Sequence, residues 1–175
     1  DKHGIERVVL SINMPGAEVL PEDDGVDVAR VVNDEFTRLA RQHPDRILAL
    51  ATLPWRAPQE AVHELQRLRD NQEFVGIMTF SNVDGIALDD IKFWPIYWKA
   101  QEMGLPLYLH PTRPVIAPFV NEYGLEGMLG YVYDTSLAAM RLILGGVVDA
   151  FPELKIVVPH AGGVLPYLAA RIDHQ

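Results

Sequence analysis

The 175-residue sequence predicts an α/β fold built on a parallel β-sheet. Short apolar runs typical of strands alternate with segments in which apolar residues recur at helical spacing. The strand-like runs are mostly apolar throughout rather than alternating with polar residues, which is typical of strands covered on both faces. Regular alternation of strands and helices indicates parallel strands joined by right-handed helical crossovers.

Each predicted element has its own local pattern. The runs expected to form strands cover residues 8–12, 47–53, 74–80, 106–110 and 155–160. The segments expected to form helices cover residues 26–42, 58–71, 95–103, 135–151 and 164–173. Pro58 and Pro95 suit first helical turns, Gly104 suits a helix end, and Asp134 is expected to be an N-cap. The longest irregular stretch, residues 112–134, follows a strand and is expected to form a lid or a substrate wall.

The number of strands limits the choice of architecture. Residues 1–175 are expected to form one domain, and five β-α units are too few for a closed barrel of eight, which takes about 250 residues. The pattern alone leaves two alternatives, an open doubly wound sheet or the middle of a (β/α)8 barrel.

Composition excludes several classes of function. The formal net charge of −9 argues against a nucleic-acid partner, and no polybasic segment suits an anionic membrane. The chain contains no cysteine, so a metal would need histidine or oxygen ligands. No apolar run is long enough to span a membrane and residues 1–9 do not resemble a signal peptide, so a cytoplasmic protein is expected.

Two histidines end strand-like runs. His110 ends the fourth run and His160 ends the fifth, 160 − 110 = 50 residues later. The carboxyl ends of adjacent parallel strands meet at the edge where α/β proteins bind ligands. A single histidine at a strand end is more often a packing or capping residue, but a pair at one edge favours chemistry. Ala161, Gly162 and Gly163 would let the backbone approach a ligand; a phosphate site at this turn is the weaker alternative, because no lysine supports it.

The remaining histidines and acidic or aromatic clusters favour structural roles. His43 and His63 fall on predicted helices, His174 lies near the end of the sequence, and His3 precedes its strand rather than ending it. Asp89 and Asp90 are expected in a solvated loop. The aromatic residues at helical spacing, expected to pack the outer layer, are Trp94, Tyr97 and Trp98.

The motifs LPLYLHPT (105–112), FWPIYWKAQEMGLP (93–106) and the run from Tyr133 to Asp173 resemble the decarboxylase-type branch of the amidohydrolase superfamily. That branch includes aminocarboxymuconate-semialdehyde, resorcylate and dihydroxybenzoate decarboxylases. The resemblance covers the whole chain and implies a (β/α)8 barrel, of which these residues form roughly strands 2 to 6. It also implies one divalent metal ion, with zinc expected and manganese as the alternative.

The resemblance implies roles for individual residues. His110 matches a metal ligand, and His160 matches a histidine that acts beside the metal as acid, base or orienting group. Arg171 matches an arginine that binds substrate carboxylate in the partner subunit's site, which implies a homodimer. Arg113 is a second candidate for the carboxylate, because it follows His110 closely in the sequence.

Two departures from the family pattern limit the metal site. No His-x-His or Glu-x-His pair stands where a first strand would end, and the aspartate of strand 8 has no counterpart. One ligand of four is therefore present, whereas catalytic metal sites use three or more protein ligands. The chain is expected to be a barrel incomplete at both ends, belonging to a longer enzyme and inactive alone.

The expected reaction is non-oxidative decarboxylation of a small carboxylated aromatic or ring-derived compound. The metal would act as a Lewis acid or bind a water whose pKa falls to about 7, and His160 would transfer a proton. Hydrolysis of a lactone, amide or ester on the same scaffold is the first alternative. A scaffold protein without a complete metal site is the second.

Overall fold

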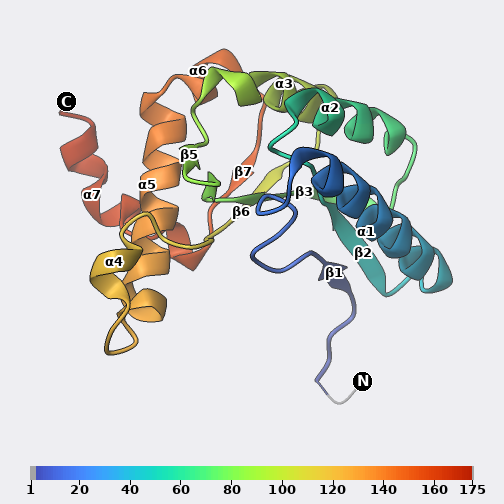
Figure 1. Ribbon diagram of the computed structural model, residues 1–175, viewed down its shortest axis with the longest axis horizontal. Helices are drawn as coiled ribbons and strands as arrows, with labels where there is room; N and C mark the ends of the chain where they lie inside the picture. Colours follow the sequence, from blue (N-terminus) through green and yellow to red (C-terminus); the bar gives the residue numbers. More distant parts are fainter. Residues whose placement is uncertain (1–2, 175) are drawn as a thin grey trace.

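The computed structural model describes residues 3–174 and contains a five-stranded parallel sheet (Figure 1). The strands lie side by side in the order in which the chain forms them: β1 (Val8–Leu10), β2 (Ile47–Ala51), β3 (Phe74–Phe80), β6 (Leu107–His110) and β7 (Ile156–Val157). A doubly wound sheet reverses its strand order at a switch point, whereas the wall of a barrel does not. The structure is therefore a partial (β/α)8 barrel, as the resemblance implied.

All five predicted strands are present, but the two outer strands are shorter than expected. β1 and β7 each pair with one neighbour among the described residues, and the pairing ends at Leu10 and Val157. An antiparallel hairpin that the sequence did not predict, β4 (Asn82–Val83) and β5 (Ile86–Ala87), follows β3.

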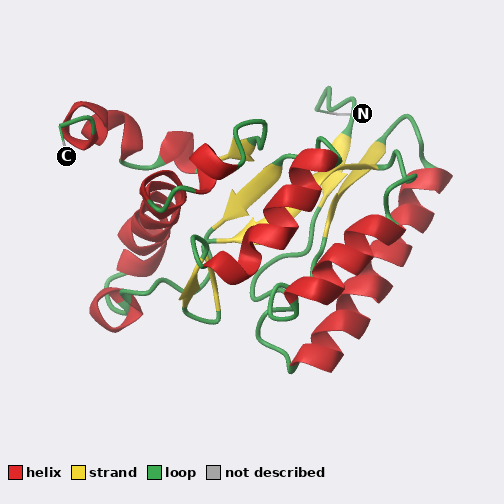
Figure 2. Ribbon diagram, turned by 90° about the horizontal axis from the view of Figure 1, so that it is seen from above, coloured by secondary structure: helices red, strands yellow, loops and turns green. Residues whose placement is uncertain are grey.

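The main helices cover one face of the sheet (Figure 2). They are α1 (Glu22–Gln42), α2 (Pro58–Arg67), α3 (Trp94–Glu102) and α5 (Tyr131–Leu144), while α7 (Leu165–Ile172) lies beyond α5, away from the sheet. Short helical elements lie between them: η1 (Ile91–Phe93), α4 (Ala117–Val120), η2 (Glu126–Gly130), α6 (Val147–Ala150) and η3 (His160–Gly162). The single helix predicted for residues 135–151 is wrong, because Gly146 takes a left-handed conformation (φ 82°) that separates α5 from α6.

The helix-covered face contains the main hydrophobic core. Trp55, Phe93 and Tyr97 are fully buried there, with Trp55 and Phe93 edge to face at 5.7 Å between ring centroids. Tyr97 also donates a hydrogen bond to the Leu88 carbonyl at 2.6 Å. Of the aromatic residues expected in the outer layer, Tyr97 and Trp94 pack against Phe151, but Trp98 is 56% exposed.

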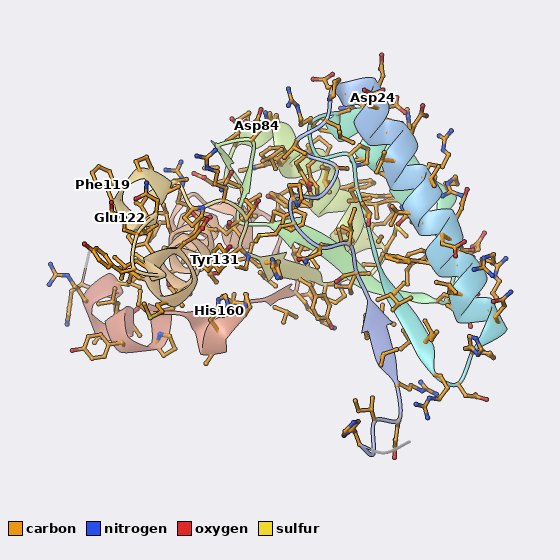
Figure 3. The ribbon with its side chains drawn as sticks, turned by 60° about the horizontal axis from the view of Figure 1, so that its bottom comes forward. Asp24, Asp84, Phe119, Glu122, Tyr131 and His160 are labelled. Carbon is orange, nitrogen blue, oxygen red and sulfur yellow. The ribbon has the colours of Figure 1, made fainter. Side chains whose placement is uncertain are left out.

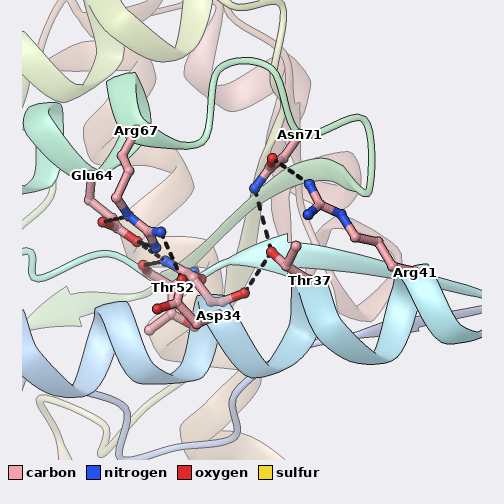
Figure 4. Close-up of polar contacts among 8 residues, drawn as sticks. Asp34, Thr37, Arg41, Thr52, Glu64, Arg67 and Asn71 are labelled. Carbon is pink, nitrogen blue, oxygen red and sulfur yellow. Dashed lines mark hydrogen bonds and ion pairs between the residues drawn. The ribbon is translucent and has the colours of Figure 1, made fainter.

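A buried polar cluster joins α1 and α2 to the end of β2 (Figure 4). The fully buried Asn33 amide donates to the Thr52 carbonyl at 2.9 Å and to Glu64 Oε1 at 2.7 Å, and Asn33 Oδ1 accepts from the Thr52 amide. Arg67 forms two hydrogen bonds to Glu64, which raise the pKa of the guanidinium, and a further one to Asp34. The Asn33 side chain and the Glu64 carboxylate are paired in this cluster, which fixes both helices relative to the carboxyl end of the sheet, while the buried Thr52 hydroxyl has no partner among the described residues.

The opposite face of the sheet carries a much smaller cluster. Leu50, Met78 and Phe80 are its buried members, and Tyr108 packs against them. Gly76 makes this packing possible, because a Cβ there would lie 2.6 Å from the Tyr108 ring. This face corresponds to the interior of the barrel.

None of the helices formed by residues 3–174 has the length and apolar character needed to cross a membrane.

Candidate active site

His110 ends β6 at the mouth of the partial barrel. Its Nδ1 lies 2.7 Å from the Pro111 carbonyl oxygen, and its ring meets Phe80 edge to face at 5.9 Å. A carbonyl can only accept, so this contact places the proton on Nδ1 and leaves the Nε2 lone pair free. Metal-ligating histidines are usually oriented in this way, by donating their other ring N–H to a carbonyl or carboxylate.

His160 lies on a turn with an unusual backbone. His160 and Ala161 have φ of 54° and 53°, followed by positive φ at Gly162 and Gly163. Left-handed conformations are unfavourable for residues other than glycine and tend to occur at functional sites. Thr135 Oγ1 lies 3.3 Å from His160 Nδ1, and the imidazole is otherwise exposed (Figure 3).

Ser136 holds this turn in place from helix α5. Its hydroxyl donates to the Val132 carbonyl at 2.7 Å and accepts from the Val164 amide at 3.0 Å. A side chain at Gly163 would collide with the Ser136 hydroxyl, so the close approach expected for the glycine pair is made to α5. β6 and β7 are adjacent and parallel, so the ends carrying His110 and His160 lie at the same edge of the sheet, as predicted.

A cavity of about 320 Å³ opens at this edge, next to Phe80. Its polar and charged lining residues come from the loops that follow β1 and β6 and from the β4–β5 hairpin: Glu18, Asn82, Asp84, Thr112 and Arg113. Arg113 is exposed and forms no ion pair within residues 3–174, so its guanidinium is available to an anion. Glu18 is 6% exposed, and desolvation by burial raises the pKa of its carboxyl to about 7.

Asp134 fixes the loop that follows His110, and its predicted role as an N-cap is wrong. It lies in the first turn of α5, which begins at Tyr131, and is 2% exposed. Its carboxylate accepts from the Ser81 hydroxyl, from the Asn82 side chain at 3.3 Å and from the Val115 amide at 3.0 Å. The aspartate is therefore a buried clamp between the end of β3 and the loop.

Ser81 completes this clamp by pairing β3 to the same loop. The Ser81 amide donates to the His110 carbonyl at 2.9 Å, and its hydroxyl accepts from the Thr112 amide at 3.1 Å. The loop expected over residues 112–134 is correspondingly shorter and more ordered than predicted. It contains α4 and η2 before α5 begins.

The sequence reasoning missed Glu18, Ser81 and Asn82. Ser81 and Asn82 could have been found, because they directly follow a strand at the edge where ligands bind. No sequence signal indicated Glu18, because it lies in a loop several residues beyond the end of β1. Asp89, expected in a solvated loop, accepts two hydrogen bonds from Arg141 at 2.6 and 2.9 Å, and Asp90 caps η1.

The predicted carboxylate-binding residues are not brought together. Arg113 lines the cavity, whereas Arg171 lies exposed in the last turn of α7, which sits beyond α5 from the sheet in Figure 1. Within residues 3–174 no three histidine, aspartate or glutamate side chains group closely enough to hold a metal. These residues therefore fit one ligand position, at His110 Nε2, and not a complete metal site.

The parallel sheet, the histidine at its edge and the adjoining cavity define the class of (β/α)8-barrel proteins with a site at the carboxyl end of the strands. The chain belongs to the amidohydrolase family, whose model matches residues 9–174. The resemblance to the decarboxylase-type branch is confirmed by individual relatives.

Three of these relatives illustrate the similarity. Gamma-resorcylate decarboxylase of Rhizobium radiobacter is 35% identical over 186 residues, covering 100% of this chain and 57% of the relative. The structure of 5-carboxyvanillate decarboxylase from Sphingomonas paucimobilis superimposes with a TM-score of 0.94 at 31% identity, covering 99% of this chain and 52% of that one.

The third relative carries a metal. The 5-carboxyvanillate decarboxylase of Novosphingobium aromaticivorans, in complex with manganese and 4-hydroxy-3-methoxy-5-nitrobenzoic acid, has a TM-score of 0.90 at 29% identity. The match covers 98% of this chain and 50% of that structure. The chain thus spans about half the length of the relatives it matches, between 50% and 57% for these three.

Proposed function

We propose that this chain is part of a metal-dependent, non-oxidative decarboxylase that acts on a small carboxylated aromatic compound. The observation that carries the proposal is His110: its Nδ1 contact with the Pro111 carbonyl leaves Nε2 free, and its ring meets Phe80, which lines the same cavity as Arg113. Decarboxylases among the relatives support the reaction type. In this proposal the enzyme is a longer chain, and residues 1–175 form a single domain that is incomplete at both ends.

We further propose that His110 is one of several metal ligands, the others coming from outside residues 3–174. The bound metal would polarise a substrate oxygen as a Lewis acid. A relative with bound manganese favours manganese over the zinc expected from the sequence.

In the proposed reaction, the carbon–carbon bond to the carboxylate breaks and CO2 leaves. The electron pair that remains on the ring carbon must then take a proton. His160 would deliver this proton, since histidine is the side chain that most often acts as a general acid and this imidazole is exposed. The Thr135 hydroxyl, 3.3 Å from Nδ1, would orient the ring.

Arginine side chains would hold the departing carboxylate by paired, charge-assisted hydrogen bonds. Arg113 suits this role within its own site. Arg171 would serve the partner subunit's site in a homodimer, which agrees with its exposure on α7 and its distance from the cavity lining.

The test is turnover and metal content of the full-length protein with His160→Ala. The variant should lose CO2 release from hydroxybenzoates while retaining its metal, whereas His63→Ala, on the exposed surface of α2, should change neither. Unchanged turnover in His160→Ala would exclude the proton-transfer role. Acid release from esters or lactones without CO2 release would identify a hydrolase instead.

A further inference from the structure

Glu18 is a buried carboxyl with an unused hydrogen-bonding oxygen at the edge of the cavity. The side chain is 6% exposed, and Oε2 has no hydrogen-bond partner among residues 3–174. Leaving such an atom buried and unpaired is unfavourable, because its hydrogen bonds to water are lost without replacement. Native structures leave few polar groups in this state, and those that remain call for an explanation.

Two other polar side chains around the cavity already have partners. Asp84 pairs with Arg56 at 3.1 Å. The Asn82 side chain accepts from the Gly85 amide at 2.9 Å and donates to Asp134. Among the charged lining residues in the described part of the chain, Glu18 and Arg113 are therefore the two whose side chains have no ion-pair partner and can bind a ligand.

The positions of these two residues suit a ligand that is polar at both ends. Arg113 comes from the loop after β6 and Glu18 from the loop after β1, with the Phe80 ring in the cavity wall. An arginine binds a carboxylate, an aromatic wall suits a flat ring, and a free carboxyl oxygen accepts a hydrogen bond from a hydroxyl group. A hydroxylated aromatic carboxylate has all three features.

We propose that Glu18 determines substrate specificity by accepting a hydrogen bond from a ring hydroxyl of an aromatic acid whose carboxylate faces Arg113. This inference rests on the proposed function, because it assigns a substrate contact within the same site. It adds a specific consequence: the cavity discriminates between hydroxylated and unsubstituted benzoates. A site with a buried acceptor discriminates strongly against a ligand that leaves the acceptor unpaired.

Two substitutions of Glu18 distinguish an effect of hydrogen bonding from an effect of side-chain shape. Glu18→Gln keeps the length of the side chain and one acceptor oxygen, whereas Glu18→Leu keeps similar bulk and removes the acceptor. Preference for the hydroxylated ligand should therefore persist in the glutamine variant and disappear in the leucine variant. Since burying a leucine in place of an unpaired carboxyl costs little, the leucine variant should fold, and its thermal transition checks this.

The experiment measures dissociation constants of benzoate, 2-hydroxybenzoate and 2,6-dihydroxybenzoate by calorimetry on the full-length protein at pH 7. Glu18→Leu should weaken binding of the hydroxylated ligands by roughly tenfold and change benzoate binding less than about twofold. Arg113→Ala, by contrast, should weaken all three ligands. The parent protein should bind the hydroxylated ligands more tightly than benzoate.

The outcomes distinguish this inference from the proposed function. Equal loss for all three ligands in Glu18→Leu, no loss for any, or no binding of the benzoates by the parent would overturn the inference. Selective loss without CO2 release would support Glu18 as the specificity residue while excluding the decarboxylase. CO2 release with unchanged ligand preference in Glu18→Leu would leave the proposed function standing and exclude the role of Glu18.

Discussion

The helix-covered face of the sheet and the face opposite differ in how much apolar surface they bury. Between residues 3 and 174, the covered face contributes 23 buried residues to one core cluster, whereas the open face contributes three to its own. In a (β/α)8 barrel the inner face is filled by side chains from all eight strands. The folding stability of this chain therefore depends mainly on the outer layer, and the inner face with its edge serves the site.

Two neighbouring residues of β3 test this difference most directly. Ile77 faces the covered core and is fully buried, while Met78 faces the open side and is 7% exposed. Ile77→Ala should lower the free energy of unfolding by about 4 kcal/mol, and Met78→Ala by about 2 kcal/mol, because fewer atoms surround the smaller cluster. Urea denaturation followed by circular dichroism measures both. Equal losses would mean that the two faces support the fold alike.

Asp134 tests whether the edge of the sheet is stabilised by polar contacts rather than by burial of apolar side chains. Asp134→Ala should cost about 3 kcal/mol, because the buried Ser81 hydroxyl and the Val115 amide lose their acceptor. Hydrogen exchange should also show faster exchange of the Val115 amide. Asp149→Ala, an exposed position on α6, is the matched control and should change stability little. Unchanged protection of Val115 would contradict the clamp.

Glu18 should make the stability of the protein depend on pH, whereas the apolar side chains of the core carry no group that titrates in this way. Its pKa of about 7 in the folded chain exceeds the ordinary value of 4.5, so the unfolded state favours the ionised form. The contribution of protonated Glu18 to the free energy of unfolding is fully present below pH 4.5 and is lost as pH rises through 7. At pH 8, Glu18→Gln should therefore be more stable than the parent, by about 3 kcal/mol at most.

Denaturation at pH 4 and pH 8 measures the effect of Glu18, and at pH 4 the advantage of the glutamine variant should vanish. Glu22→Gln, at the exposed start of α1, controls for the loss of one negative charge. A constant difference between parent and Glu18→Gln at both pH values would mean that Glu18 is not buried in solution.

Arg171 should show the smallest effect on stability. Its side chain is exposed on α7, so Arg171→Ala should change the free energy of unfolding by less than about 0.5 kcal/mol. In the full-length enzyme the same change should raise KM, because the proposed role is to bind substrate carboxylate in the partner's site. Arg30→Ala on the exposed side of α1 is the control for charge. A large stability loss would indicate a structural role instead.

Much of the fold followed from local patterns. Pro58 and Pro95 lie in the first turns of α2 and α3, and β3 and β6 match their predicted runs closely. The predictions failed where a boundary depends on distant partners. β7 ends early where its pairing with β6 stops, and α5 begins before its expected cap because Asp134 is recruited into the clamp with β3.

The residues of the candidate site likewise fall into those that the sequence could predict and those that it could not. His110 and His160 were predictable, because a residue that ends a parallel strand lies at the ligand-binding edge whatever its neighbours are. Glu18 was not, because its carboxyl and the Phe80 ring, 80 − 18 = 62 residues later in the chain, come together around Gly16 only in the folded structure.

The sequence by itself determined the alternation of strands and helices, the family and the histidines at the strand ends, since each depends on short-range periodicity or on a contiguous motif. Only the tertiary structure decided that Asp134 is a clamp, that Glu18 is buried and unpaired, and that Arg113 shares its cavity. The physical reason is that burial, and hence hydrogen-bond satisfaction and pKa, depends on groups far apart in the chain that meet only when the sheet forms.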